Sequence, residues 1–190
     1  MISRTKIKSP DTLPFFHYTP RLFNRPYGWE KKTPQVTVPH YVACAEEPLT
    51  FSVVSFVRDI HLVRDNSPTL PHEVYVNFEP CYTADGVVLA KMCANTAQPP
   101  QEYDPESPYL LEARKNMQVR VTIYEPFKDS QTRPYGDHWN MARLPPSNVQ
   151  SGDLVIVECK IAKSKEEDGE KWHTELELMG IALVLKRSEQ

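Results

Sequence analysis

Apolar residues recur at every second position in several stretches of the chain, which is the period of a half-buried β-strand. The clearest case is EVYVNFE at residues 73–79, where three apolar side chains share one face and Tyr75 and Asn77 share the other. Residues 50–64 are rich in β-branched and aromatic side chains and are long enough to form a strand that bends across a sheet. Further strands are predicted at residues 87–93, 118–125, 154–162 and 172–186.

The alternation also assigns the two faces of these strands. Arg120 and Tyr124 fall on the outward face of 118–125, and Lys160 falls on the outward face of 154–162. The residues expected to point into the core are Val74, Val76, Phe78, Val119, Val121, Ile123, Val155, Val157, Cys159 and Ile161.

Local signals place turns, a helix and a bulge between the strands. Asp85-Gly86 is typical of a hairpin turn, and Gly152-Asp153 is expected to turn the chain into the strand that follows. Ser107-Pro108 suits an N-cap followed by proline at the first helical position, which predicts a short helix to about Met117. The apolar parity of the last strand changes around Met179-Gly180, which indicates a β-bulge.

Proline is abundant and unevenly placed, with 18 prolines and only 6 glycines in 190 residues. This composition excludes a collagen-like repeat and disfavours a long helical bundle. Residues 1–40 hold six prolines interleaved with aromatic side chains, which predicts an extended arm ahead of a single β domain at residues 41–190. The aromatic residues of the arm indicate that it packs along a surface, either its own domain's or a partner's.

Charge follows the same division. The chain carries a net charge of −3, yet residues 1–38 hold seven Lys/Arg against two acidic residues, while residues 39–190 hold 15 basic and 23 acidic residues. A basic arm on an acidic body suits contact with a polyanion such as nucleic acid. The same distribution also suits an arm that folds back on its own acidic body, and the sequence gives the two interpretations equal weight.

The sequence contains no recognisable catalytic motif. A nucleophile elbow, a phosphate-binding loop and an H-E-x-x-H helix are all lacking, and the four cysteines form no C-x-x-C pair. We therefore expect a non-enzymatic protein without a cofactor or a metal site. No apolar run is long enough to span a membrane and the first residues lack a secretory h-region, so an intracellular location, nuclear or cytoplasmic, is expected.

Basic and aromatic side chains recur together on the predicted outward faces and in the long loops. Single-stranded nucleic acid is bound by this combination, because aromatic rings stack on bases while cations neutralise the backbone. For each aromatic ring the competing interpretation is a residue that covers the core, and for each lysine it is an ordinary solvated charge. The candidate binding residues are Tyr75, Asn77, Arg120, Tyr124, Arg133, Tyr135, Trp139, Lys160, Lys163 and Trp172.

The order of a long bent strand, a second strand, the D-G hairpin, a third strand, a helix and two further strands resembles an OB-fold, a small Greek-key barrel. Within it, GDLVIVECKIAKSKEEDGEKWHTELELMGIALVL at residues 152–185 resembles an OB strand pair joined by a charged hairpin. The resemblance implies binding of single-stranded DNA or RNA across the barrel face.

The sequence thus predicts a mainly β protein, an OB-like Greek-key barrel with one short helix and an extended N-terminal arm. The expected function is binding of single-stranded DNA or RNA, as part of a nucleoprotein assembly. The alternative is a protein-interaction or assembly domain that docks on a partner or a second copy through residues 1–40, and no membrane partner is expected.

Overall fold

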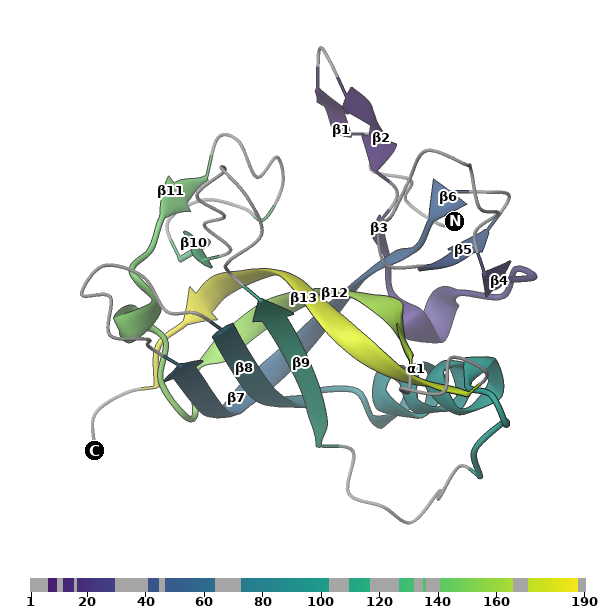
Figure 1. The fold of residues 1–190 in the computed structure, drawn as a ribbon. Coiled ribbons are helices and arrows are strands. Elements are labelled where there is room, and N and C mark those ends of the chain that lie inside the picture. The colour runs from purple at the N-terminus through teal and green to yellow at the C-terminus, as the bar shows by residue number, and fades with distance from the viewer. Residues whose placement is uncertain are drawn as a thin grey trace.

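A computed structural model describes residues 7–9, 12–15, 17–29, 41–44, 47–63, 73–102, 110–116, 127–131, 135, 141–165 and 171–187, and Figure 1 shows their arrangement. The described residues are mainly β-strand with a single α-helix, which confirms the predicted fold class. The elements in chain order are β1 (Ile7–Ser9), β2 (Thr12–Phe15), β3 (His17–Tyr18), the 3₁₀ helix η1 (Pro20–Leu22), β4 (Gly28–Trp29), β5 (Val42–Cys44), β6 (Glu47–Pro48), β7 (Thr50–Val63), β8 (Glu73–Pro80), α1 (Thr83–Thr96), β9 (Leu111–Asn116), β10 (Phe127–Asp129), β11 (Ala142–Arg143), the 3₁₀ helix η3 (Pro146–Asn148), β12 (Leu154–Lys165) and β13 (Trp172–Leu185).

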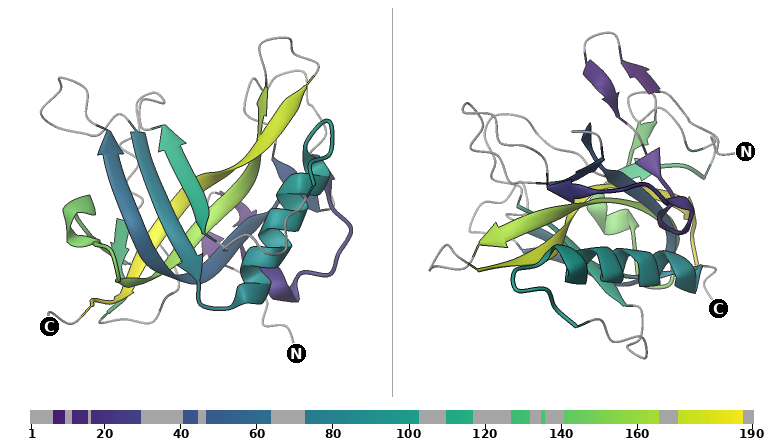
Figure 2. Two further views of the ribbon diagram at one scale, coloured as in Figure 1. Left: turned by 90° about the horizontal axis from the view of Figure 1, so that it is seen from below. Right: turned by 90° about the vertical axis from the view of Figure 1, so that its right-hand side faces the viewer.

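Five strands close into a ring in the order β7–β8–β9–β13–β12, with β12 returning to β7. Four of the five pairings are antiparallel, and β9 with β13 is parallel, with Ala113 beside Leu176 and Arg114 beside Glu177. Figure 2 shows α1 lying along the β12–β13 side of this ring. This closed Greek-key arrangement is consistent with the OB-like architecture expected from the sequence.

The core fills the inside of the ring, where the alternating strands direct their apolar side chains. Every predicted inward residue of β8 and β12 is fully buried, namely Val74, Val76, Phe78, Val155, Val157, Cys159 and Ile161. Phe51 and Val53 of β7 and Leu178 of β13 complete this layer, and Leu89 and Met92 of α1 add to it from the helix. The inward assignments at Val119, Val121 and Ile123 lie outside the described residues.

The expected bulge and turn are both present. Glu158 of β12 faces Gly180 and Cys159 faces Leu178, so Met179 is the extra residue of a bulge at the predicted position. Gly152 has a φ of 93°, a backbone conformation that favours glycine, and the Asp153 carboxylate accepts hydrogen bonds from the backbone N–H groups of Gln150 and Arg187. The Gly152-Asp153 turn thereby fixes the start of β12 against the end of β13.

The hairpin predicted at Asp85-Gly86 and the strand predicted at residues 87–93 are wrong. The helix α1 occupies this stretch and carries Asp85 in its first turn. A D-G hairpin needs alternating strands on both sides, whereas Leu89 and Met92 recur three residues apart and both pack into the core. An acidic residue in the first turn also interacts favourably with the helix dipole.

The short helix predicted from Ser107-Pro108 to about Met117 is also wrong over its described part. Residues Leu111–Asn116 form β9, although the segment LEARKN is rich in good helix formers. As a strand, it hydrogen-bonds to β8 on one side and to β13 on the other, and it buries Ala113 completely. Closure of the ring by these tertiary contacts outweighs the local helix propensity.

Residues 17–29 of the N-terminal arm pack on their own domain, whereas β1 and β2 pair with each other in a separate two-stranded sheet. The strand β3 pairs in parallel with the start of β7, and the ring of Phe23 makes an edge-on contact with Phe51 at 5.8 Å between centroids. Tyr18 also makes an edge-on contact with Phe23, at 5.2 Å between centroids. Residues 17–29 are therefore held by the body of the chain, while the division into an arm at 1–40 and a domain at 41–190 stays a prediction.

Full burial of Cys159 and partial burial of Cys93 predict a specific labelling pattern. Burial raises the pKa of the Cys93 thiol to about 12, and it raises the pKa of the fully buried Cys159 as well. Because the thiolate is the reactive form and a raised pKa leaves little of it at pH 8, iodoacetamide should react slowly with both residues in the folded protein. The exposed Cys81 is the internal control and should react faster than Cys93 and Cys159, as followed by peptide mass spectrometry. Native labelling of Cys159 as fast as Cys81 would contradict the buried position.

Candidate nucleic-acid interface

A row of side chains runs across the strands on the outer surface of the ring. Strand pairing places His61 beside Tyr75, Tyr75 beside Arg114, Arg114 beside Glu177 and Glu177 beside Lys160. Residues directly opposite one another in a sheet share a face, so these five form one continuous outer row from β7 through β8, β9 and β13 to β12. The row brings together two candidates, Tyr75 and Lys160, that lie far apart in the sequence.

Tyr75 and Arg114 form the first cation–aromatic pair of the outer row. The guanidinium carbon of Arg114 lies 5.3 Å from the centroid of the Tyr75 ring. The Tyr75 hydroxyl donates a hydrogen bond to the Glu73 carboxylate, and this bond raises the pKa of Tyr75. Both partners are thus fixed on the surface, with Tyr75 kept as the neutral phenol.

Arg114 is also held by carboxylates on either side. Its Nη2 donates to Glu112 Oε1 at 2.7 Å, and its Nε lies 3.9 Å from Glu175 Oε2. Partial burial disfavours the charged form of Arg114, but the hydrogen bond and charge of Glu112, together with Glu175, outweigh it and raise the pKa of Arg114. The cation is therefore permanently charged and already partnered.

Lys160 makes the second cation–aromatic pair, with Tyr41. Its side chain is only 7% exposed, and its Nζ lies 4.8 Å from the centroid of the Tyr41 ring. The Tyr41 hydroxyl donates to Glu177, and the Lys115 ammonium pairs with the same carboxylate. Lys160 is thus the nearly buried member of the outer row, and Tyr41 is the more accessible member of the pair.

The third cation–aromatic pair belongs to a compact Trp cluster, formed by Trp29, Lys163 and Trp172. The Lys163 ammonium lies 3.3 Å from the centroid of the Trp172 ring and 5.8 Å from that of Trp29. The Trp172 indole N–H donates to the Thr96 carbonyl at 3.0 Å, at the end of α1. Two backbone hydrogen bonds between Trp172 and Gln98 add to this, so the ring of Trp172 is held rigidly.

The Trp cluster and the outer row occupy opposite faces of the β12–β13 ribbon. Lys160 and Lys163 are an odd number of residues apart on β12, and side chains alternate between the two faces of a strand. Lys163 faces Thr174, whose hydroxyl donates to the Cys93 carbonyl of α1, so the Trp cluster lies on the helix side. The two groups are separated by the thickness of one two-stranded ribbon.

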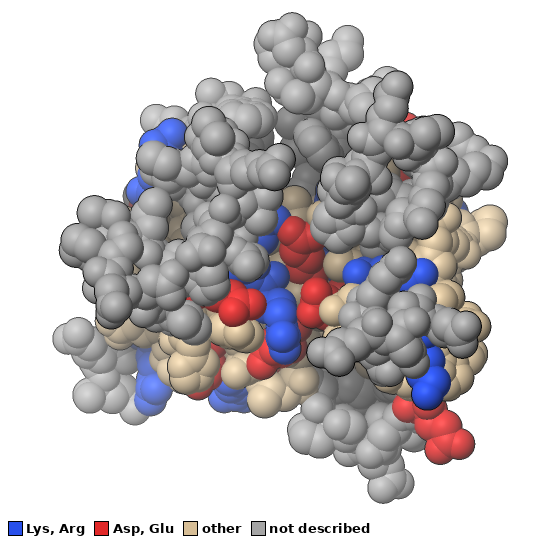
Figure 3. Space-filling model, viewed as in Figure 1, with Lys and Arg blue, Asp and Glu red and all other residues tan. Residues whose placement is uncertain are grey.

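Charges of both signs are intermixed on the surface around the outer row. Figure 3 shows Lys/Arg and Asp/Glu side chains next to one another on the described part of the side that carries β9 and β13. Several of the described cations of this ring have carboxylate partners: Arg58 with Glu79, His61 with Asp59, Arg114 with Glu112 and Lys115 with Glu177. A polyanion bound to this face must compete with the protein's own carboxylates.

The structure places six of the ten candidate residues. Tyr75 and Lys160 lie in the outer row, and Lys163 and Trp172 lie in the Trp cluster. Asn77 of β8 stands between Asp59 and Glu112 on the neighbouring strands, and the Tyr135 hydroxyl lies 3.5 Å from Ser52 Oγ. The remaining four, Arg120, Tyr124, Arg133 and Trp139, lie outside the described residues.

Three members of the cation–aromatic pairs and the Trp cluster escaped the sequence-based assignment. Arg114 was assigned to a helix, although Glu112 and Arg114 alternate with the buried Ala113 as a strand requires. Trp29 and Tyr41 come from the N-terminal part of the chain, and no local pattern connects them with Lys163 or Lys160. Only the tertiary structure brings these rings to the two lysines.

No group of three or more potential metal ligands exists among the described residues, and none of the helices there is long and apolar enough to cross a membrane. No protein-family model and no curated protein sequence matches the chain. The chain is similar to a solved structure of a C-terminally truncated single-stranded DNA-binding protein from bacteriophage Enc34, with a TM-score of 0.46 and 10% identity over 86% of this chain and 98% of the other. A structure of the single-stranded DNA-binding protein from the same phage gives a TM-score of 0.41 and 9% identity over 86% and 92%.

The geometry of the Trp cluster predicts that Lys163 contributes to stability. Replacing it in the variant Lys163→Ala removes the cation from both indole rings and should lower the free energy of unfolding by about 0.5–2 kcal/mol. Urea denaturation followed by circular dichroism measures this loss. Lys186→Ala, at an exposed lysine just after β13, is the matched control and should change stability by less than about 0.5 kcal/mol. Equal effects of the two variants would argue against the Trp cluster as described.

Proposed function

We propose that this protein binds single-stranded nucleic acid through the outer row and the Trp cluster. The observation that carries the proposal is the recurrence of cation–aromatic pairs on the ring, formed by Arg114 with Tyr75, Lys160 with Tyr41 and Lys163 with Trp172. Aromatic rings that stack on bases, set beside cations that neutralise phosphates, are the elements by which proteins bind single strands without strong sequence preference. Both DNA and RNA offer this chemistry, and the proposal covers both.

Two of the three pairs supply both a stacking ring and a phosphate-binding cation in this proposal. The rings of Tyr75 and Trp172 stack on bases, while Arg114 and Lys163 contact phosphates. Lys160 is nearly buried and acts through Tyr41, whose ring it supports. Asn77 offers hydrogen bonds to base edges beside Tyr75, and the candidates outside the described residues, Arg120, Tyr124, Arg133 and Trp139, together with Tyr135, would extend the interface along the loops.

The carboxylates around the outer row set the strength of binding. Arg114 and Lys115 already have carboxylate partners, Glu112 and Glu177. The binding free energy gained when a phosphate contacts either cation is therefore only the difference between the attraction of the cation to the phosphate and its attraction to the carboxylate. We therefore propose a binder in which stacking contributes much of the affinity and salt weakens the remainder. The function is binding without a chemical step, in an intracellular nucleoprotein assembly.

Fluorescence anisotropy with labelled oligo-dT and oligo-U tests the proposal. The protein should bind at micromolar concentration in low salt and lose affinity as salt rises. Trp172→Ala should weaken binding by about 1–3 kcal/mol, because it removes one stacking ring. Phe56→Ala is the control, since Phe56 is an exposed ring on β7 away from the cation–aromatic pairs. Failure of the wild-type protein to bind either oligonucleotide at low salt would reject the proposed function.

If carboxylates compete with phosphates for the cations of the outer row, removing one carboxylate should increase the affinity for oligonucleotides. Glu112→Gln removes the main partner of Arg114 and should strengthen oligo-dT binding about twofold to fivefold, the range expected for one exposed ion pair. Glu79→Gln changes the net charge equally but frees Arg58 outside the outer row, so it should have a smaller effect. Anisotropy titrations of both variants at the same salt concentration make the comparison. Identical gains would mean that net charge alone, and not the Arg114 site, controls affinity.

A second candidate function is protein interaction, and a separate group of exposed apolar residues favours it. Phe56, Leu154 and Leu185 face one another on β7, β12 and β13, and Phe56 and Leu185 are 42% and 61% exposed. Exposed apolar groups on neighbouring strands are common at contact surfaces between proteins. The arm at 1–40 was the expected docking element, and residues 17–29 within it already pack on the domain. Size-exclusion chromatography with light scattering, on the wild type and on Leu185→Ser, separates this function from nucleic-acid binding.

A further inference from the structure

We propose that the ion pair between Arg21 and Asp85 positions Trp29 for base stacking in the Trp cluster, without either residue touching the nucleic acid. The inference rests on the proposed function and names residues that control the same site. Arg21 and Asp85 lie 64 positions apart in the sequence, and neither belongs to the candidate interface.

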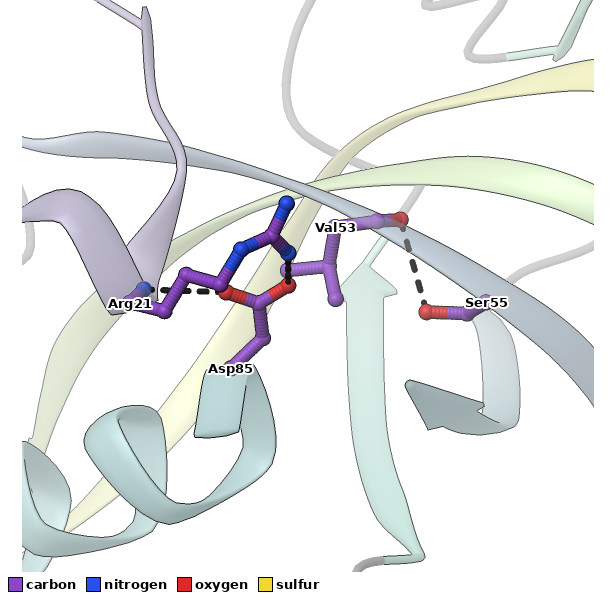
Figure 4. A network of polar contacts seen from close by, with 4 residues as sticks. All are labelled: Arg21, Val53, Ser55 and Asp85. Atoms are coloured by element: carbon purple, nitrogen blue, oxygen red, sulfur yellow. Dashed lines mark hydrogen bonds and ion pairs between the residues drawn. The ribbon is translucent and has the colours of Figure 1, made fainter. Parts of the chain in front are cut away.

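Arg21 is held by two hydrogen bonds to the carboxylate of Asp85. The backbone N–H of Arg21 donates to Asp85 Oδ1 at 2.9 Å, and the guanidinium Nη1 donates to Asp85 Oδ2 at 2.5 Å, as Figure 4 shows. The guanidinium also lies over the ring of Tyr82, 3.8 Å from its centroid. Asp85 is only 1% exposed, so loss of Arg21 would leave a buried carboxylate with one charged partner fewer. The first turn of the helix therefore holds the segment around η1 in one place.

The chain from Arg21 to Trp29 is anchored at further points. Phe23 packs against Phe51 of the core, and Trp29 pairs with Val42 through the β4–β5 ladder. Val42 itself is fully buried. Trp29 thus reaches Lys163 at the end of a short segment whose beginning is the Arg21–Asp85 contact. In this proposal, a shift at the beginning of the segment moves the Trp29 ring relative to Lys163.

The helix α1 supports both tryptophans of the cluster from its two ends. Its first turn holds Arg21 through Asp85, and its last residue, Thr96, accepts the hydrogen bond from the Trp172 indole. These two positions are about 16 Å apart along the helix axis, given the rise of about 1.5 Å per residue. The spacing of Trp29 and Trp172 around Lys163 therefore depends on contacts at both ends of one rigid element.

A positioning role and a phosphate-binding role for Arg21 predict different results. If Arg21 positions Trp29, the variant Arg21→Ala should weaken binding of oligo-dT about 3- to 30-fold and leave binding of an abasic oligonucleotide of the same length unchanged, because only stacking needs bases. The slope of affinity against salt should also stay the same. Arg21→Lys keeps the charge and should recover much of the affinity. Arg58→Ala, which breaks an exposed ion pair with Glu79, is the control for loss of one cation.

A double variant makes the test decisive. Arg21→Ala should add little to the loss caused by Trp29→Ala, because both remove the same stacking contact. Additive losses, an equal loss with the abasic strand, or wild-type affinity in Arg21→Ala would each overturn the inference. Circular dichroism checks that each variant folds, and Arg21→Gln replaces Arg21→Ala if that variant does not.

A measurement without nucleic acid separates this inference from the proposed function. In ¹⁵N NMR spectra of the free protein, Arg21→Ala should shift the indole signal of Trp29 while Arg58→Ala leaves it in place. A wild-type protein that binds no oligonucleotide would reject the proposed function, and the indole shift would still report the positioning of Trp29. An unmoved Trp29 signal in Arg21→Ala would reject the positioning role whatever the protein binds.

Discussion

The parallel pairing of β9 with β13 is the contact on which the rest of the structure depends. It joins the two ends of the strand order β13–β12–β7–β8–β9 and so turns an open sheet into a ring. Closure satisfies the backbone groups of two strand edges and encloses the apolar faces that bury Phe51, Phe78 and Leu178. It also aligns side chains from five strands around the outside, because the register of each pairing is set by which face is buried.

The ribbon of β12 and β13 carries chemistry on both of its faces. One face bears Lys160 beneath Tyr41, and the other bears Lys163 against Trp172. The helix α1 supports the second face, since its carbonyl groups accept hydrogen bonds from Trp172 and Thr174. In the proposed function, a single-stranded ligand that contacts both groups would pass around the edge of this ribbon and meet aromatic rings that the fold already holds in place.

The cations on the outer surface of the ring are largely neutralised by neighbouring carboxylates, which the net charge of the chain does not reveal. The cations of the outer row stand beside Glu112, Glu175 and Glu177, so the face presents rings and paired charges and not a continuous basic groove. In the proposed function this arrangement favours stacking over phosphate contacts. The N-terminal segment fits the same scheme, because Arg21, one of the basic residues of the arm, is engaged by the buried Asp85.

The sequence alone determined four strands, β7, β8, β12 and β13, because the composition or alternation of each segment predicts a strand without reference to the rest of the chain. The parity change at Met179 and the glycine of the Gly152-Asp153 turn likewise predicted the bulge and the turn. Alternation of apolar and polar residues also placed Tyr75 and Lys160 on the outward face, because a period of two assigns side chains to the two faces of a strand without reference to other strands. The helix at Asp85 and the strand at Arg114 were decided by tertiary contacts, since Asp85 needs Arg21 and β9 needs two partner strands to outweigh the helix propensity of LEARKN. The pairing of Trp29 with Lys163 and of Tyr41 with Lys160 likewise exists only in the folded chain, because ring closure and the docking of residues 17–29 bring together side chains that no local pattern connects.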